Sequence, residues 1–171
     1  AMTPFTPSPT ATRPHAASRG GADAAISSQL GGVGSKLRVL DLFSGIGGFS
    51  LGLERTGGFE TAAFCEIEEF PRRVLAKHWP EVPCLGDIES QNFQNLGPVD
   101  VVTAGFPCQD ISFAGKGAGL AGERSGLFWQ VLRTVCVVGR PRIVLENVAA
   151  LVNRGLSTVL GALAQIGYDS E

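Results

Sequence analysis

From residue 36 onward, short apolar runs alternate with segments in which apolar residues recur at helical spacing. Four runs have the length and composition of buried strands: residues 37–43, 59–67, 99–105 and 142–148. Residues 83–90 form a shorter segment of the same character. Strands that are apolar on both faces are typical of a parallel sheet covered by helices on both sides.

The segments between these runs supply the covering helices. Their predicted apolar faces are Ile46, Phe49 and Leu53; Ile67, Phe70, Val74 and His78; Leu127, Val131 and Val135, with Phe128, Leu132 and Cys136 beside them; and Leu156, Val159, Leu160 and Leu163. The alternation predicts an α/β, doubly wound domain of about five strands over residues 36–171. Ligands of such sheets bind beyond the carboxyl ends of the strands.

Residues 1–35 have a different composition, rich in Pro, Ala, Ser, Thr and Gly, without a sustained apolar period. This composition predicts a disordered tail outside the fold. Arg13 and Arg19 against the single acid Asp23 leave a transit peptide as an alternative, but no amphipathic stripe supports it.

Composition narrows the class of protein further. No apolar run approaches the roughly 18 residues that a membrane span needs. The four cysteines lie far apart without a C-x-x-C pair, so neither a disulfide framework nor a metal site is predicted, and a reducing cytoplasm is the expected location. The formal net charge of −2 provides no basic footprint for nucleic acid. If DNA is the partner, most of the positive surface is expected elsewhere.

Candidate chemistry follows the apolar runs. Gly45, Gly47 and Gly48 follow the first run and permit a tight turn with close approach of a ligand to the backbone. Three acids, Asp41, Glu66 and Asp87, stand at the ends of three successive strand-like segments. Each alone reads as a surface group or helix cap, but together they favour a nucleoside ligand with hydroxyl and amino donors.

Cys108 follows the fourth run in the stretch "GFPCQDIS", between residues that prefer turns or the surface. Such surroundings predict a Cys108 thiol that is accessible to a substrate rather than buried in the core. Glu146 follows the fifth run, where a carboxylate can bind the substrate that a thiol attacks. At adjacent strand ends, the two residues predict a nucleophile and its substrate-binding partner.

The ordered motifs "DLFSGIGGFSLGLE", "CEIEEF", "GDI", "GFPCQDIS", "ERSGLFWQVLR" and "ENV" resemble those of C5-cytosine-specific DNA methyltransferases, from about Leu37 to Tyr168. The resemblance implies a Rossmann-like domain that binds S-adenosyl-L-methionine and methylates cytosine in double-stranded DNA. It implies that Phe43 lies against the adenine, that Glu66 holds the ribose, that Ile67 and Ile88 flank the adenine, and that Asp87 accepts from its amine.

The same resemblance places Gly45, Gly47 and Gly48 near the methionine part of the cofactor, and Pro107 and Leu127 at the closure of its pocket. Cys108 is then the nucleophile that adds to C6 of cytosine, and Glu146 binds the edge of the base. The glycine-rich residues 112–126 correspond to a loop that closes over a flipped base.

The resemblance also implies that the second half of the catalytic domain is absent: a strand with paired arginines, the target-recognition domain and a final helix. Residues 142–146 then become a sheet edge with unpaired backbone groups. We expect a fragment with little activity alone, either truncated or acting with a complementary C-terminal polypeptide, and a monomer when complete. A cofactor-binding remnant and a tRNA-methylating enzyme remain as alternatives. A nicotinamide-dependent oxidoreductase fits poorly, since the glycine spacing is not G-x-G-x-x-G and Cys108 is left unexplained.

Overall fold

The computed structural model describes residues 35–107 and 126–170. Apart from Ser35, these residues belong to the compact unit Lys36–Glu171. The predicted tail over residues 1–35, except for Ser35, lies outside the described residues, and so does Cys108 with most of the glycine-rich loop that follows it. The elements are β1 (Leu37–Leu42), α2 (Gly48–Glu54), β2 (Phe59–Cys65), α3 (Glu69–His78), β3 (Cys84–Leu85), η1 (Phe93–Asn95), β4 (Val101–Gly105), α4 (Leu127–Val137), β5 (Arg142–Glu146), α5 (Ala150–Arg154) and α6 (Leu156–Gln165).

Five strands form one sheet in the order β3-β2-β1-β4-β5. All four pairings are parallel, and β1 at the centre pairs with both β2 and β4. The chain winds outward from β1 through β2 to β3 and then crosses to β4 on the other side. This order confirms the α/β fold predicted from the alternating pattern, and it places the reversal of winding between β1 and β4.

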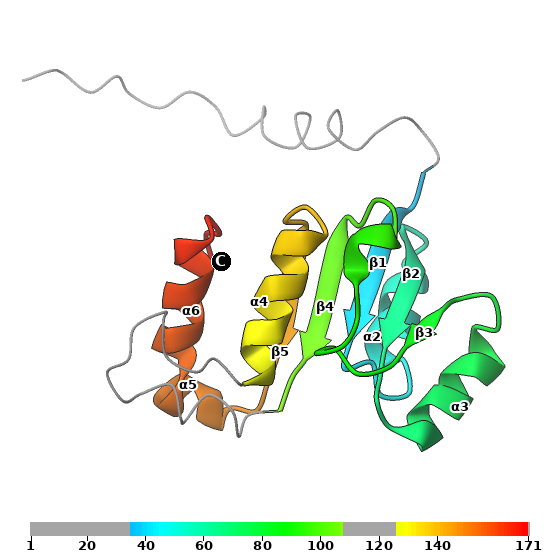
Figure 1. Ribbon diagram of the computed structural model, residues 1–171, viewed down its shortest axis with the longest axis horizontal. Helices are drawn as coiled ribbons and strands as arrows, with labels where there is room; N and C mark the ends of the chain where they lie inside the picture. The colour runs from blue at the N-terminus through cyan, green and yellow to red at the C-terminus, as the bar shows by residue number, and fades with distance from the viewer. Residues whose placement is uncertain (1–34, 108–125, 171) are drawn as a thin grey trace, which may run out of the picture. The chain divides into compact units, whose positions relative to one another are not determined.

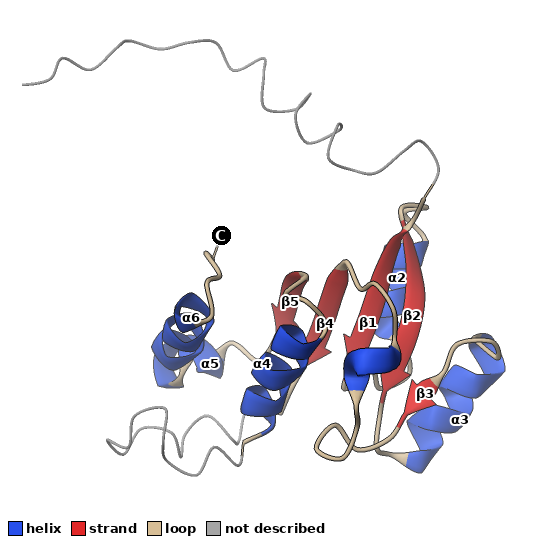
Figure 2. Cartoon of the chain, turned by 45° about the horizontal axis from the view of Figure 1, so that its top comes forward, coloured by secondary structure: helices blue, strands red, loops and turns tan. Residues whose placement is uncertain are grey.

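Helices cover both faces of the sheet (Figures 1 and 2). On the face of α4 and α6, the core joins the inward side chains of β1, β2 and β4 to helical side chains such as Phe128, Val131 and Val159. On the opposite face, behind the sheet in Figure 1, α2 covers β1 and β2. No described helix is long and apolar enough to cross a membrane.

The strand β5 departs from the pattern of a fully buried strand. Ile143 and Leu145 are half-buried, whereas Arg142, Val144 and Glu146 are exposed. Within the described residues β5 pairs only with β4, so its other side is a free edge. The predicted exposure of this edge is therefore confirmed, while the expectation of burial on both faces is wrong for β5.

Three predicted helical faces also need correction. Ile46 and Ile67 precede the helices to which periodicity assigned them, and both are more than 60% exposed. In α3, Phe70 and His78 are exposed and Leu75 is the buried residue, because its side chain packs toward the glycine loop after β1. In α4, Cys136 is exposed while Val131 and Val135 are buried as expected.

Candidate cofactor and catalytic site

The loop after β1 has a left-handed backbone at several positions. Phe43 has φ 54°, Gly45 has φ 52° and Gly47 has φ 88°. The Ser44 hydroxyl donates to the Asp41 carbonyl at 2.6 Å and accepts from the Cys65 amide at 3.1 Å. These bonds join the loop to the carboxyl ends of β1 and β2.

The glycines of this loop serve different purposes. A Cβ at Gly47 would lie 2.7 Å from Cζ3 of Trp79, so this glycine is required by packing within the protein. A Cβ at Gly45 or Gly48 would meet no atom within 4 Å among the described residues. Open space beside two exposed or half-exposed backbone positions is what close approach of a ligand requires. The backbone therefore leaves room for a ligand at Gly45 and Gly48, as predicted, whereas Gly47 is required by packing against Trp79.

Glu66 lies at the carboxyl end of β2 and is 9% exposed. Its carboxylate accepts from the Gly45 amide at 2.8 Å through Oε2 and from the Glu68 amide at 2.8 Å through Oε1. The acid and the glycine loop, predicted to share a site, are thus in direct contact. Ile67 beside it is 63% exposed, an apolar side chain left at the rim of the site.

Asp87 and Ile88 follow β3 in a short turn. Asp87 Oδ1 accepts from the Glu89 amide at 2.9 Å, and the Asp87 carbonyl accepts from the Ser90 amide at 3.1 Å. The Ile88 side chain is 4% exposed and belongs to the core. Ile88 is thus anchored in the protein interior, while Asp87 remains half-buried next to the sheet edge.

The prediction that Asp41 binds a ligand together with Glu66 and Asp87 is not supported by its surroundings. Its side chain is fully buried and accepts from the Thr103 hydroxyl at 2.6 Å and from the Ser50 hydroxyl at 2.8 Å. Burial raises its pKa to about 6, although both hydroxyls act in the opposite direction. Asp41 joins β1, β4 and α2, a structural role that the sequence pattern of strand-end acids did not distinguish from ligand binding.

The ends of β4 and β5 lie side by side. Gly105 pairs with Glu146, and a Cβ at Gly105 would lie 3.1 Å from Glu146 Oε2. The Asn147 side chain donates through Nδ2 to the Phe106 carbonyl at 2.7 Å, and thereby holds the two strand ends together. Pro107, the last described residue before Cys108, is exposed. Leu127 begins α4 and is half-buried against the core.

The other cysteines can be compared with the expected nucleophile. Cys65, Cys84 and Cys136 are free thiols. Burial raises the pKa of Cys65 to about 12, and its sulfur donates to the Gly86 carbonyl at 3.1 Å. A thiol with so high a pKa forms little thiolate near neutral pH. Cys65 is therefore unsuited to nucleophilic attack.

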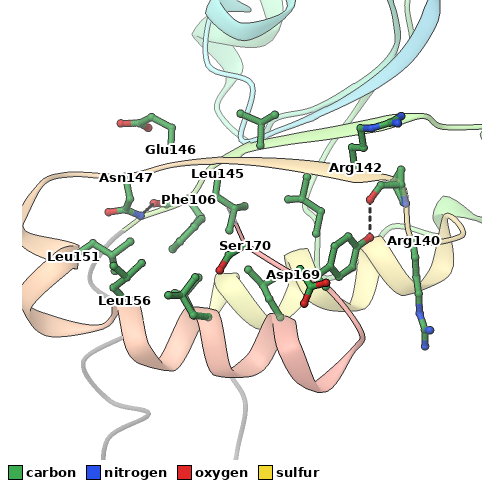
Figure 3. A pocket seen from close by; sticks show the side chains of 17 residues that line it. Phe106, Arg140, Arg142, Leu145, Glu146, Asn147, Leu151, Leu156, Asp169 and Ser170 are labelled. Carbon is green, nitrogen blue, oxygen red and sulfur yellow. Dashed lines mark hydrogen bonds between the residues drawn. The ribbon is translucent and has the colours of Figure 1, made fainter. Parts of the chain in front are cut away.

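A cavity of about 720 Å³ lies along the free side of β5, between this strand and α6 (Figure 3). Ile143 and Leu145 of β5 and Leu156, Val159 and Leu163 of α6 line it. The Tyr168 hydroxyl donates to the Pro141 carbonyl at 2.6 Å and fixes the segment after α6 at one end. Glu146 also lines this cavity, and Figure 3 shows its side chain directed away from α6.

Known proteins share this architecture and sequence. The structure of the S. pombe Dnmt2 methyltransferase superposes with a TM-score of 0.61 at 21% identity, over 79% of this chain and 42% of that one. The type II methyltransferase M2.BsuMI of Bacillus subtilis is 39% identical over 140 residues, which are 77% of this chain and 35% of the relative. The type II methyltransferase M.AluI of Cellulosimicrobium cellulans is 36% identical over 146 residues, which are 79% of this chain and 28% of the relative.

The chain thus spans about a third of the length of the curated relatives that it matches. The family model of C-5 cytosine-specific DNA methylases matches residues 37–171, the whole of the sheet and its helices. The predicted motifs of the family all fall within this match. On this evidence, the chain belongs to the family of C-5 cytosine-specific DNA methylases.

Proposed function

We propose that this chain is the part of a DNA cytosine-5 methyltransferase that holds S-adenosylmethionine and supplies Cys108 and Glu146 to the reaction. The observation that carries the proposal is the hydrogen bond of 2.8 Å between the Gly45 amide and the Glu66 carboxylate. It brings the glycine loop and a buried acid together at the carboxyl edge of the sheet, next to the reversal of winding between β1 and β4. Ligands of open α/β sheets bind at this position.

The described residues fit the proposed cofactor. Gly45 and Gly48 leave space along the backbone for the methionine part, and exposed Ile67 provides an apolar surface for the adenine. Glu66 retains acceptor capacity for ribose hydroxyls, since each carboxylate oxygen can accept more than one hydrogen bond. Asp87 accepts from the Glu89 amide through Oδ1, and its Oδ2 is the proposed acceptor for the adenine amine. Bound in this site, S-adenosylmethionine supplies an electrophilic methyl group.

The proposed chemistry of the chain begins at Cys108, just beyond exposed Pro107. Its thiolate adds to C6 of cytosine, forming a carbon–sulfur bond and raising the electron density at C5. Glu146 binds N3 and the exocyclic amine, and stabilises the charge that develops on the ring. After C5 has received the methyl group, loss of the C5 proton and elimination of the Cys108 thiolate break the carbon–sulfur bond and restore the aromatic base. The target cytosine has to leave the helix for this attack, at a cost of a few kcal/mol.

Further polypeptide is needed to complete the enzyme, either in the same chain or in a separate one. The β5 edge supports this part of the proposal. The Arg142 amide donates to Asp100 on the β4 side, so the amides and carbonyls of Ile143 and Leu145 point away from β4. An additional strand could bind these groups and cover the apolar cavity above α6. The base-edge contacts that select a DNA sequence would come from the same additional polypeptide.

Covalent trapping tests the reaction. The chain is incubated with S-adenosylmethionine and duplex DNA containing 5-fluorocytosine, with and without a polypeptide that corresponds to the remainder of a type II relative. We expect a covalent adduct only in the complemented mixture, and none with Cys108→Ala. An adduct or product formed by the chain alone would refute the need for further polypeptide. A folded, complemented mixture without adduct would identify a cofactor-binding remnant.

Substitution of the loop glycines tests the cofactor site separately. Gly48→Ala fills the open space beside the backbone and should weaken binding of S-adenosylmethionine, measured by calorimetry, at least about ten-fold. Gly52→Ala, also in α2 and also without neighbours within 4 Å among the described residues, is the matched control. Equal affinity for the two variants would contradict the placement of the cofactor beside Gly48.

A further inference from the structure

The turn that carries Asp87 is held to the sheet by few backbone bonds. The preceding strand β3 has only two residues, Cys84 and Leu85. Asp87 and Ser90 then bond within the turn, through the Ser90 amide at 3.1 Å and the Ser90 hydroxyl at 3.0 Å. These bonds fix the shape of the turn but not its position relative to the rest of the domain.

One charged side chain from another element binds this turn. Arg133 of α4 donates through Nη2 to the Ile88 carbonyl at 2.7 Å, across 45 positions of sequence. A hydrogen bond with a charged donor is stronger than one between neutral groups. Together with the buried Ile88 side chain, this bond joins the turn to α4, the helix that begins at Leu127.

The bond also bears on the orientation of Asp87. Asp87 Oδ1 accepts from the Glu89 amide at 2.9 Å, and no other described group donates to Oδ2. The direction of the free oxygen therefore depends on where the Asp87–Ser90 turn lies. The Ile88 carbonyl and the Glu89 amide belong to one peptide unit, so a displaced Ile88 carbonyl moves the amide that holds Asp87 Oδ1 and turns the Asp87 carboxylate.

We propose that Arg133 is a positioning residue for the purine end of the cofactor site, which fixes Asp87 so that it selects a purine with an amino group over one with an oxo group. This inference rests on the proposed binding of S-adenosylmethionine. An amino group donates a hydrogen bond to a carboxylate, whereas an oxo group only accepts and therefore offers Asp87 no donor at that ring position. Arg133 itself does not touch the ligand.

The test compares S-adenosylhomocysteine with S-inosylhomocysteine, which differ at this ring position. Arg133→Met keeps most of the aliphatic stem and removes the donors, and Arg133→Lys restores one charged donor. We expect Arg133→Met to lower the preference for the adenosyl ligand at least about ten-fold, and Arg133→Lys to recover part of it. Arg73→Met on α3, with a side chain that is 69% exposed, is the control. An unchanged ratio of the two affinities in Arg133→Met would overturn the inference.

A second measurement does not depend on ligand binding. Hydrogen exchange of the Glu89 and Ser90 amides, both of which donate to Asp87, should accelerate in Arg133→Met and not in Arg73→Met. If the unmodified chain binds neither ligand even in the complemented mixture, the proposed cofactor site is wrong, and the exchange rates still decide whether Arg133 orders the turn. Unchanged exchange would refute the positioning role in either case.

Discussion

Replacement of Asp41 by asparagine should change the pH dependence of folding. Asp41 is fully buried between β1, β4 and α2, and its two partners, Thr103 and Ser50, are neutral hydroxyls. Its pKa rises from 3.8 to about 6, chiefly because burial disfavours the charged form. Asparagine has nearly the same shape and can bond the same hydroxyls, which are able to accept as well as donate. It carries no charge at any pH.

The sign and size of the effect follow from linkage. Because the folded-state pKa is raised, the contribution of Asp41 to stability is fully present below pH 3.8 and is lost as the pH rises through about 6. A difference of about two pKa units corresponds to about 3 kcal/mol. Of this amount, about 2 kcal/mol is lost between pH 4.5 and 7.5.

Urea unfolding of the chain and of Asp41→Asn across that pH range measures the difference. We expect the difference in the free energy of unfolding, Asp41→Asn minus the unmodified chain, to rise by about 2 kcal/mol from pH 4.5 to 7.5. Other titrating groups contribute equally to both proteins and cancel in the difference. Asp169→Asn, at an exposed position, controls for the loss of one charge. Parallel stability curves for the chain and for Asp41→Asn would refute the reasoning.

Two further substitutions test contacts around the site, each by urea unfolding. Gly47→Ala should cost roughly 2–4 kcal/mol, since the added methyl lies 2.7 Å from the Trp79 ring and the backbone is left-handed. Gly57→Ala, with φ +82° and no described atom within 4 Å, should lose only about 1–2 kcal/mol from backbone strain, and equal losses would exclude the steric explanation. Asn147→Asp should cost about 1–3 kcal/mol, because it removes the donor to the Phe106 carbonyl. That loss should shrink at acidic pH, where the introduced carboxyl can donate again; a pH-independent loss would contradict this account.

The alternation of apolar runs and helical segments was sufficient to predict the fold, because burial of strands on both faces leaves a strong pattern. It failed where burial is one-sided. In α3 the buried residue is Leu75 rather than Phe70, since it is Leu75 that faces the glycine loop after β1. Two helices, α5 and α6, occupy the region where one was expected, because Gly155 separates them with a non-helical backbone.

The sequence predicted which residues follow the strands, but not which of them contact one another. Glu66 and the glycine loop meet as expected, since both follow parallel strands that end at one edge. Asp41 has the same position relative to its strand, yet its side chain points into the sheet face covered by α2, and no feature of one sequence separates it from Glu66. The contact of Arg133 could not be predicted either, because its partner is a backbone carbonyl and every residue has one.

The two parts of the site differ in how far this chain alone can order them. The glycine loop is held by Ser44, by the Glu66 carboxylate and by the Trp79 ring beside Gly47, all of which lie in the part of the chain that the structure describes. Glu146, in contrast, stands exposed at the end of an edge strand whose outward backbone groups need a partner. We therefore expect cofactor binding to survive in the isolated chain while methyl transfer does not. Calorimetry on the isolated chain measures cofactor binding, and the trapping assay measures the reaction of Cys108. An isolated chain that neither binds the cofactor nor forms the adduct would show that the glycine loop also needs further polypeptide.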